Sequence, residues 1–166
     1  MHLSELEQVR KARLDKIREL NVDPYGVAVQ GIEKIGSLVH NFKAGEPLAP
    51  NPDSLFYSTP RRAQGRIILR RDNGGLIWFK IRDDSGEIQV AFSKKAANEP
   101  ENFALAKLTD LGDIIAVDGP IRRTQTGEIT IWASRIYLAC KSLAHPPDKI
   151  DGLQDVEIRY RQRYLD

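Results

Sequence analysis

Two turn sequences near the middle of this 166-residue chain divide residues 61–92 into three short strand-like runs. The first turn is Asp72-Asn73-Gly74-Gly75 and the second is Asp83-Asp84-Ser85-Gly86. Asn, Asp and Gly tolerate positive φ, so both segments can close tight connections between strands. The runs between them are rich in Ile, Leu, Val, Trp and Phe, which favour strands. The pattern therefore predicts a three-stranded antiparallel meander.

Trp78 and Phe79 are adjacent in the second predicted strand. Because successive side chains of a strand point to opposite faces, one ring faces solvent or a ligand when the other packs in the core. Residues 61–92 carry seven Lys or Arg against four Asp or Glu, although the net charge of the whole chain is only +2. An exposed aromatic ring among arginines is suited to stacking unpaired nucleobases. The alternative is a partly buried Trp78 beside ordinary solvated arginines.

The spacing of apolar residues outside the meander predicts the other helices and strands of a single domain. Outside the meander, the periodicity predicts an amphipathic helix over 3–21, a short helix over about 32–42, a helix over 101–108, and strands over 114–123 and 128–138. Three strands, a helix and two strands are the element order of the OB-fold, a five-stranded Greek-key barrel. The outer face of its second and third strands is the usual ligand surface, which is where Trp78 and Gln89 fall.

The expected fold is therefore mainly β with flanking helices. We expect an N-terminal amphipathic helix within 1–25, an irregular connection over 26–60, and an OB-fold barrel over 61–141. Residues 142–166 contain Pro146-Pro147 and then a helical pattern that stops in mid-repeat. This last segment predicts a linker and the start of a further domain beyond Asp166.

Composition narrows the class of protein. The single Cys140 excludes an internal disulfide framework and fits a reducing compartment. His2, His40 and His145 lie far apart without cysteine or carboxylate partners at ligand spacing, so we expect no metal site. No apolar run is long enough to span a bilayer, and the N-terminal residues contain no apolar core of the kind a signal peptide has. We expect a soluble, cytoplasmic protein without a membrane partner.

Several segments resemble the N-terminal part of class II lysyl-tRNA synthetases. They are Gly65-Arg66, Trp78 followed by Gln89, Asp110-Leu111-Gly112-Asp113, Thr124-Gln125-Thr126-Gly127-Glu128, and the closing run from Gly152 to Asp166. The aromatic-to-Gln spacing is shared with aspartyl- and asparaginyl-tRNA synthetases. The Thr-x-Thr-Gly-Glu turn and the closing Arg-Tyr-Arg-Gln-Arg-Tyr-Leu-Asp favour lysine.

The resemblance implies an OB-fold that binds the anticodon loop of tRNA(Lys) and no DNA. By this resemblance Trp78 stacks on the central anticodon uridine, at a position where the family usually has Phe. Arg71 and Gln89 then bind the edges of that base, and Glu128 reads a neighbouring base. Their chemistry agrees: Arg71 donates, the Gln89 amide both donates and accepts, and ionised Glu128 accepts.

Basic side chains elsewhere are candidate phosphate contacts. On the predicted sheet they are Arg66, Arg70 and Lys80, and on the first helix they are Arg10, Lys11 and Arg13. Such contacts add a salt-sensitive, sequence-independent attraction. For the helix, the alternative is a solvated face without a ligand.

The resemblance also implies a parent enzyme that joins lysine to tRNA through a lysyl-adenylate, using ATP and magnesium. Its catalytic domain would lie beyond Asp166, so we expect no catalytic residue and no cofactor in this chain. The parent is expected to be a homodimer that pairs mainly through parts outside this chain. The alternatives are the anticodon-binding domain of an aspartyl- or asparaginyl-tRNA synthetase, a general single-strand-binding OB module, or an OB interaction domain without nucleic acid.

Overall fold

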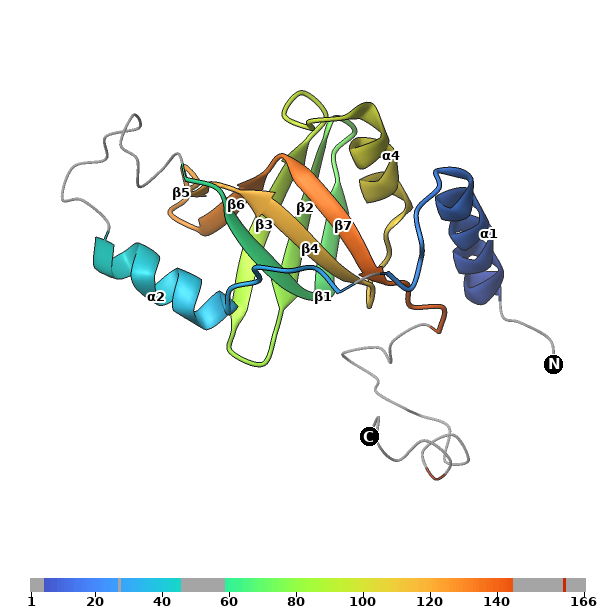
Figure 1. Ribbon diagram of the computed structural model, residues 1–166, viewed down its shortest axis with the longest axis horizontal. Helices are drawn as coiled ribbons and strands as arrows, with labels where there is room; N and C mark the ends of the chain where they lie inside the picture. Colours follow the sequence, from blue (N-terminus) through green and yellow to red (C-terminus); the bar gives the residue numbers. More distant parts are fainter. Residues whose placement is uncertain (1–4, 27, 46–58, 145–159, 161–166) are drawn as a thin grey trace.

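The computed structural model describes residues 5–26, 28–45, 59–144 and 160. Within them the chain forms helices around a seven-stranded sheet (Figure 1). The helices are α1 (Glu5–Glu19), α2 (Ile35–Gly45) and α4 (Pro100–Leu108). The strands are β1 (Arg61–Asp72), β2 (Leu76–Arg82), β3 (Glu87–Ser93), β4 (Ile114–Gly119), β5 (Ile121–Arg123), β6 (Ile129–Ala133) and β7 (Arg135–Cys140). This architecture confirms the expected mainly β fold with flanking helices.

The apolar character of the helices and the extent of the described C-terminal segment bear on two further expectations. None of the described helices is long and apolar enough to cross a bilayer. The predicted linker and closing helix over 142–166 lie outside the described residues, apart from 142–144 and 160.

The predicted meander is formed by β1, β2 and β3. β1 pairs antiparallel with β2, and β2 pairs antiparallel with β3. At the first turn, the N–H of Asn73 donates to the carbonyl of Leu76, and the N–H of Gly74 donates to Asp72 Oδ1, both at 2.9 Å. Gly74 has a φ of 76°, a left-handed conformation that glycine adopts without steric cost. The turn residues therefore place the hairpin where the sequence predicts it.

Asp83 organises the second turn and joins it to α2. Its Oδ1 accepts hydrogen bonds from Ser85 Oγ and from the backbone N–H groups of Ser85 and Gly86. Its Oδ2 accepts a 2.9 Å hydrogen bond from the N–H of Ile35 at the start of α2. Burial raises the pKa of Asp83, but these donors outweigh it and hold the pKa below its ordinary value. One carboxylate thus fixes both the turn and the helix start.

We expect Asp83→Asn to lower the free energy of unfolding by about 1–2 kcal/mol at neutral pH, because one accepting oxygen becomes a donor. A carboxylate with a lowered pKa stabilises the fold above its unfolded pKa, and this contribution is lost as the pH falls through the folded pKa. Urea titrations should therefore show a difference that shrinks below about pH 4. Asp84→Asn is the matched control, since exposed Asp84 pairs with exposed Lys34 and should contribute little. Equal losses in both variants would contradict the role of Asp83.

The predicted fourth and fifth strands are each broken in two, so the described part of the OB-fold has seven strands where five were expected. Pro120 separates β4 from β5, and Ser134 separates β6 from β7. Proline has no N–H to donate to a ladder, so pairing is interrupted there. Gly119 approaches the Trp132 carbonyl so closely that a Cβ would lie 2.2 Å from that oxygen. The sheet order is β5-β6-β3-β2-β1-β4-β7, and the sheet is not closed.

The two bends are held against each other by backbone hydrogen bonds. The N–H of Trp132 donates to the carbonyl of Pro120, and the N–H of Ser134 donates to the carbonyl of Asp118, both at 2.9 Å. The separate halves of each predicted strand therefore remain adjacent at their breaks while pairing with different neighbours.

One hydrophobic core lies against the sheet and the helices. From α4, Phe103 stacks on Phe92 of β3 with ring centroids 6.0 Å apart. From α2, Ile35 and Phe42 are buried, and from α1 Ile17 is buried. Figure 1 shows α1 beside α4 at one end of the domain and α2 at the other. The outer face of the meander is left uncovered by these helices.

A buried charged cluster joins α1, the turn before β4 and the chain after β7. Lys141 is 2 % exposed, and its ammonium lies 2.6 Å from Asp110 Oδ2 and 2.8 Å from Asp113 Oδ2. Arg13 pairs with the other oxygen of Asp110. Asp113 also accepts a 2.8 Å hydrogen bond from the N–H of Ser142. Burial raises the pKa of Asp113 more than the contact with Lys141 lowers it.

Arg10 ties α1 to the same segment. Its side chain donates from Nη1 to the carbonyls of Ser142 at 2.9 Å and Ala144 at 3.3 Å, and from Nη2 to the carbonyl of Leu111 at 2.9 Å. The first helix is therefore hydrogen-bonded to the chain that leaves β7.

Candidate nucleic-acid interface

A groove of about 800 Å³ lies over the meander, β6 and the loop between β5 and β6. The four residues predicted to read bases, Arg71, Trp78, Gln89 and Glu128, all line it. In the sheet, β6, β3 and β2 are consecutive neighbours (Figure 1). The fold therefore brings together side chains from three strands and one loop.

Strand register places four of the relevant positions in one row across the sheet. Arg71 of β1 pairs with Trp78 of β2, Trp78 pairs with Ala91 of β3, and Ala91 pairs with Trp132 of β6. Phe79 points to the other face and is 1 % exposed in the core. Trp78 is partly exposed and lines the groove. Of the two adjacent rings, the indole is thus the one available to a ligand.

Trp132 lies beside Trp78 in the groove. The two ring centroids are 5.9 Å apart and the ring planes meet at 70°, an edge-to-face arrangement. Trp132 is not among the residues predicted from the sequence. A signal was present, because Trp132 alternates with the core residues Ile131 and Ala133 and so points to the opposite face. Its neighbour on that face depends on the parallel pairing of β6 with β3, which the strand pattern does not specify.

Three of the four predicted base contacts have side-chain polar groups without a partner among the described residues. Within the described part of the chain, the side chains of Arg71, Gln89 and Glu128 make no hydrogen bond or ion pair. All three line the groove, so donors and acceptors surround the Trp78 ring. A pyrimidine on that ring could therefore meet a guanidinium, an amide and a carboxylate.

The β1 arginines on either side of this set are engaged elsewhere. Arg66 donates to the carbonyl of Gly112 at 2.8 Å. Arg70 donates to the carbonyl of Lys107 and pairs with Asp72, each at 3.2 Å. Neither arginine lines the groove. Their predicted phosphate contacts would have to compete with these partners.

Lys80 is the one candidate phosphate contact that lines the groove within the described residues. Its ammonium lies 3.4 Å from Glu87. Arg82 and then Lys80 hold the pKa of Glu87 below its ordinary value. The ion pair is solvent-exposed, so it leaves Lys80 able to exchange partners at little cost.

The predicted phosphate contacts on α1 are placed differently. Arg10 is 5 % exposed and donates to three backbone carbonyls, so its burial does not fit the expected contact with a phosphate. Arg13 pairs with Asp110. Lys11 is exposed and has no partner among the described residues. In Figure 1, α1 lies on the far side of the sheet from the β5–β6 loop, and it adds no side chain to the groove.

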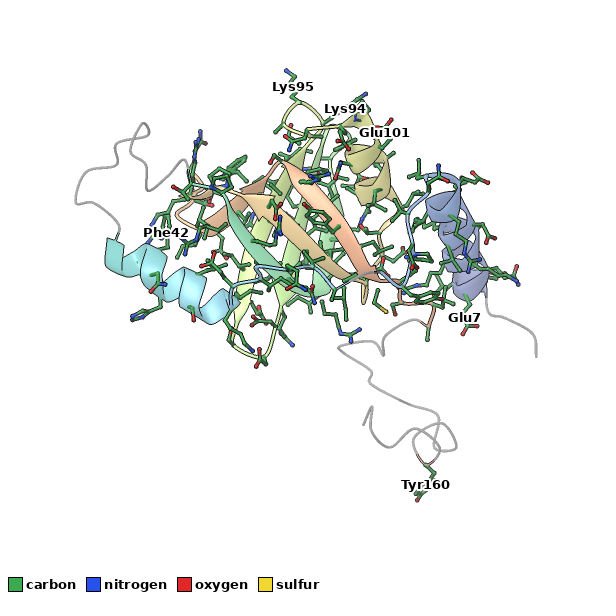
Figure 2. The ribbon with its side chains drawn as sticks, viewed as in Figure 1. Glu7, Phe42, Lys94, Lys95, Glu101 and Tyr160 are labelled. Carbon is green, nitrogen blue, oxygen red and sulfur yellow. The ribbon has the colours of Figure 1, made fainter. Side chains whose placement is uncertain are left out.

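Two lysines not predicted as contacts lie near the first turn. Lys94 and Lys95 follow β3 and point away from the domain (Figure 2). The N–H of Lys94 donates to the carbonyl of Gly75 at 2.9 Å, which fixes this loop beside the turn. The sequence signal was the Lys-Lys pair directly after the third strand.

Comparison with known proteins agrees with this geometry. Residues 62–139 match the tRNA anti-codon family, described as an OB-fold nucleic acid binding domain. The chain is 36 % identical over 164 residues to the lysine–tRNA ligase of Carboxydothermus hydrogenoformans, covering 99 % of this chain and 31 % of the relative. It is 38 % identical to the lysine–tRNA ligase of Gloeobacter violaceus and 37 % identical to that of Staphylococcus epidermidis, each over 96 % of this chain and 32 % of the relative.

The chain spans about a third of the length of these curated relatives. The match covers both the OB-fold strands and the flanking segments. Residues 62–139 therefore match an OB-fold nucleic acid binding domain of the tRNA anti-codon family, in a chain similar over nearly its whole length to lysine–tRNA ligases.

Proposed function

We propose that this chain binds the anticodon loop of tRNA(Lys), with the central uridine stacked on Trp78 and its edges bound by Arg71 and Gln89. The observation that supports this most is the groove itself, where the partly exposed Trp78 indole lies with Arg71, Gln89 and Glu128, whose side chains have no partners among the described residues. Glu128, from the β5–β6 loop, would accept hydrogen bonds from a neighbouring base. Lys80 would contact the phosphate backbone.

In this proposal, base stacking and base discrimination are carried out by different side chains. Stacking is tolerant of base identity and contributes about 1–3 kcal/mol per base. Discrimination must therefore come from the polar groups. Uracil presents two carbonyl acceptors and one N–H donor, which suits a donating guanidinium beside an amide that both donates and accepts. Cytosine presents an amino group where uracil has a carbonyl, so one protein donor would be left unpaired.

We further propose that the parent protein is a lysine–tRNA ligase that forms lysyl-adenylate from lysine and ATP with magnesium. The support is the identity to three lysine–tRNA ligases, each of which this chain covers by about a third. In this proposal catalysis belongs to the remainder of the parent, and the present chain binds tRNA without catalysing the reaction. A homodimeric parent in the cytoplasm is part of the same proposal.

The test is a titration of the 166-residue chain with anticodon stem-loops that differ only in the anticodon. We expect the UUU loop to bind most tightly and the UCU loop to bind about 1–3 kcal/mol more weakly, because the middle base loses its edge contacts. Affinity for every loop should fall as salt rises. Loops carrying GUC and GUU distinguish lysine from aspartate and asparagine identity. Equal binding of UUU and UCU at the same salt would refute base reading and leave a general single-strand-binding module.

A matched pair of variants tests which residue discriminates between the UUU and UCU loops. Gln89→Ala should narrow the ratio of UUU to UCU affinity. Gln64→Ala should leave the ratio unchanged, since Gln64 is a β1 glutamine outside the groove. The same loss of the affinity ratio in both variants would contradict a role of Gln89 in base reading.

A further inference from the structure

We infer that Trp132 is a positioning residue that holds the indole of Trp78 in the orientation needed for base stacking; this inference rests on the proposed function. The two indoles meet edge to face, with centroids 5.9 Å apart and planes at 70°. Such pairs are favourable because the positive edge of one ring meets the negative face of the other. Trp132 therefore acts on the ligand through Trp78.

Ala91 is what allows the two rings to meet. It lies between Trp78 and Trp132 in the row across β2, β3 and β6. Backbones two strands apart are separated by about 9.6 Å, so rings standing upright would be too far apart for contact. The observed 5.9 Å between centroids means that the indoles lean toward each other above the intervening methyl group. Ala91 is 1 % exposed, as expected for a small residue covered from both sides.

The indole N–H of Trp132 gives a second, independent observation. Its Nε1 is buried and has no hydrogen-bond partner among the described residues. A buried N–H without an acceptor is rare in folded proteins, and an aromatic face is a weak alternative acceptor. The Trp78 ring is the aromatic partner in contact with Trp132. Trp132 therefore packs beside the Trp78 ring, and in this inference a base stacks on the part of that ring that faces the groove.

The experiment compares Trp132→Leu and Trp132→Phe in the 166-residue chain, using the UUU stem-loop as the probe. Trp132→Leu should weaken binding by about tenfold, the upper range for losing an edge-to-face pair. Trp132→Phe keeps an aromatic edge without the N–H and should recover most of the affinity. Thermal unfolding verifies that both variants fold, and Trp132→Phe carries the test if Trp132→Leu does not fold. Tyr25→Leu, an exposed aromatic outside the groove, should bind as the unmodified chain does.

A double-mutant cycle with Trp78→Ala separates positioning from direct contact. If Trp132 acts through Trp78, Trp132→Leu should have no further effect once Trp78 is removed. Additive losses would overturn the inference, because they would mean that Trp132 affects the RNA independently of Trp78.

A measurement without RNA distinguishes this inference from the proposed function. The chain has two tryptophans, so a fixed pair should give an exciton couplet in far-ultraviolet circular dichroism that disappears in Trp132→Leu. Absence of the couplet from the unmodified chain would overturn the fixed pair even if the stem-loops bind. A couplet with no binding of any stem-loop would instead overturn the proposed function.

Discussion

Trp78→Ala should weaken binding of every anticodon stem-loop by about 3 kcal/mol, the upper part of the range for base–aromatic stacking. The large effect is expected because, in the proposed complex, Trp78 provides the stacking surface and Trp132 contacts the Trp78 ring rather than replacing it. The loss should be similar for UUU and UCU, since stacking does not read base edges. Isothermal titration at fixed salt measures both affinities.

Two controls sharpen this prediction. Trp78→Phe keeps an aromatic face and should retain most of the binding. In a Trp132→Phe chain, Trp78 is the single remaining tryptophan, so its fluorescence should change when a loop binds. Undiminished binding by Trp78→Ala, or unchanged fluorescence on saturation, would place the base elsewhere in the groove.

Lys141→Met should lower the free energy of unfolding by about 3–5 kcal/mol, because it removes one partner from a buried ionic cluster. The ammonium of Lys141 is within hydrogen-bond distance of both Asp110 and Asp113. Methionine fills a similar volume but leaves the Asp113 carboxylate without its cation. Asp110 retains Arg13 as a partner, so most of the cost should fall on Asp113. Denaturant titration by circular dichroism measures the change.

Lys34→Met is the matched control for this buried lysine. Lys34 also pairs with a carboxylate, that of Asp84, but both side chains are largely exposed. Exposed pairs contribute about 0–1 kcal/mol, so this variant should be nearly as stable as the unmodified chain. A Lys141→Met variant as stable as Lys34→Met would show that the cluster contributes no more than a surface pair.

The meander could be predicted from the sequence because its determinants are local. Within the turns, Asp72 accepts a hydrogen bond from Gly74, two positions away, and Asp83 accepts one from Gly86, three positions away, so the turn chemistry is visible in the chain itself. At the breaks near Pro120 and Ser134, Gly119 lies close to the Trp132 carbonyl, a contact between two strands that are separate in sequence. A pattern of apolar residues does not reveal such a bend.

The residues of the candidate site also differ in whether their positions could be predicted from the sequence. Trp78 and Gln89 lie on strands joined by a short turn, and the OB-fold element order placed both on the outer face. The position of Trp132 required the parallel pairing of β6 with β3. Arg10 was expected to face a phosphate, but its carbonyl partners include Ser142, 132 positions further along the chain. Periodicity identifies the face of a helix and not which distant backbone it meets.

The hydrogen bonds of Arg10 also restrict how α1 and the segment after β7 can move relative to each other. A side chain near the beginning of the described residues is fastened to carbonyls near their end, at Ser142 and Ala144. These hydrogen bonds therefore fix the positions of Ser142 and Ala144 relative to α1. In a longer parent protein, α1 and residues 142–144 would therefore move together with the sheet as one unit.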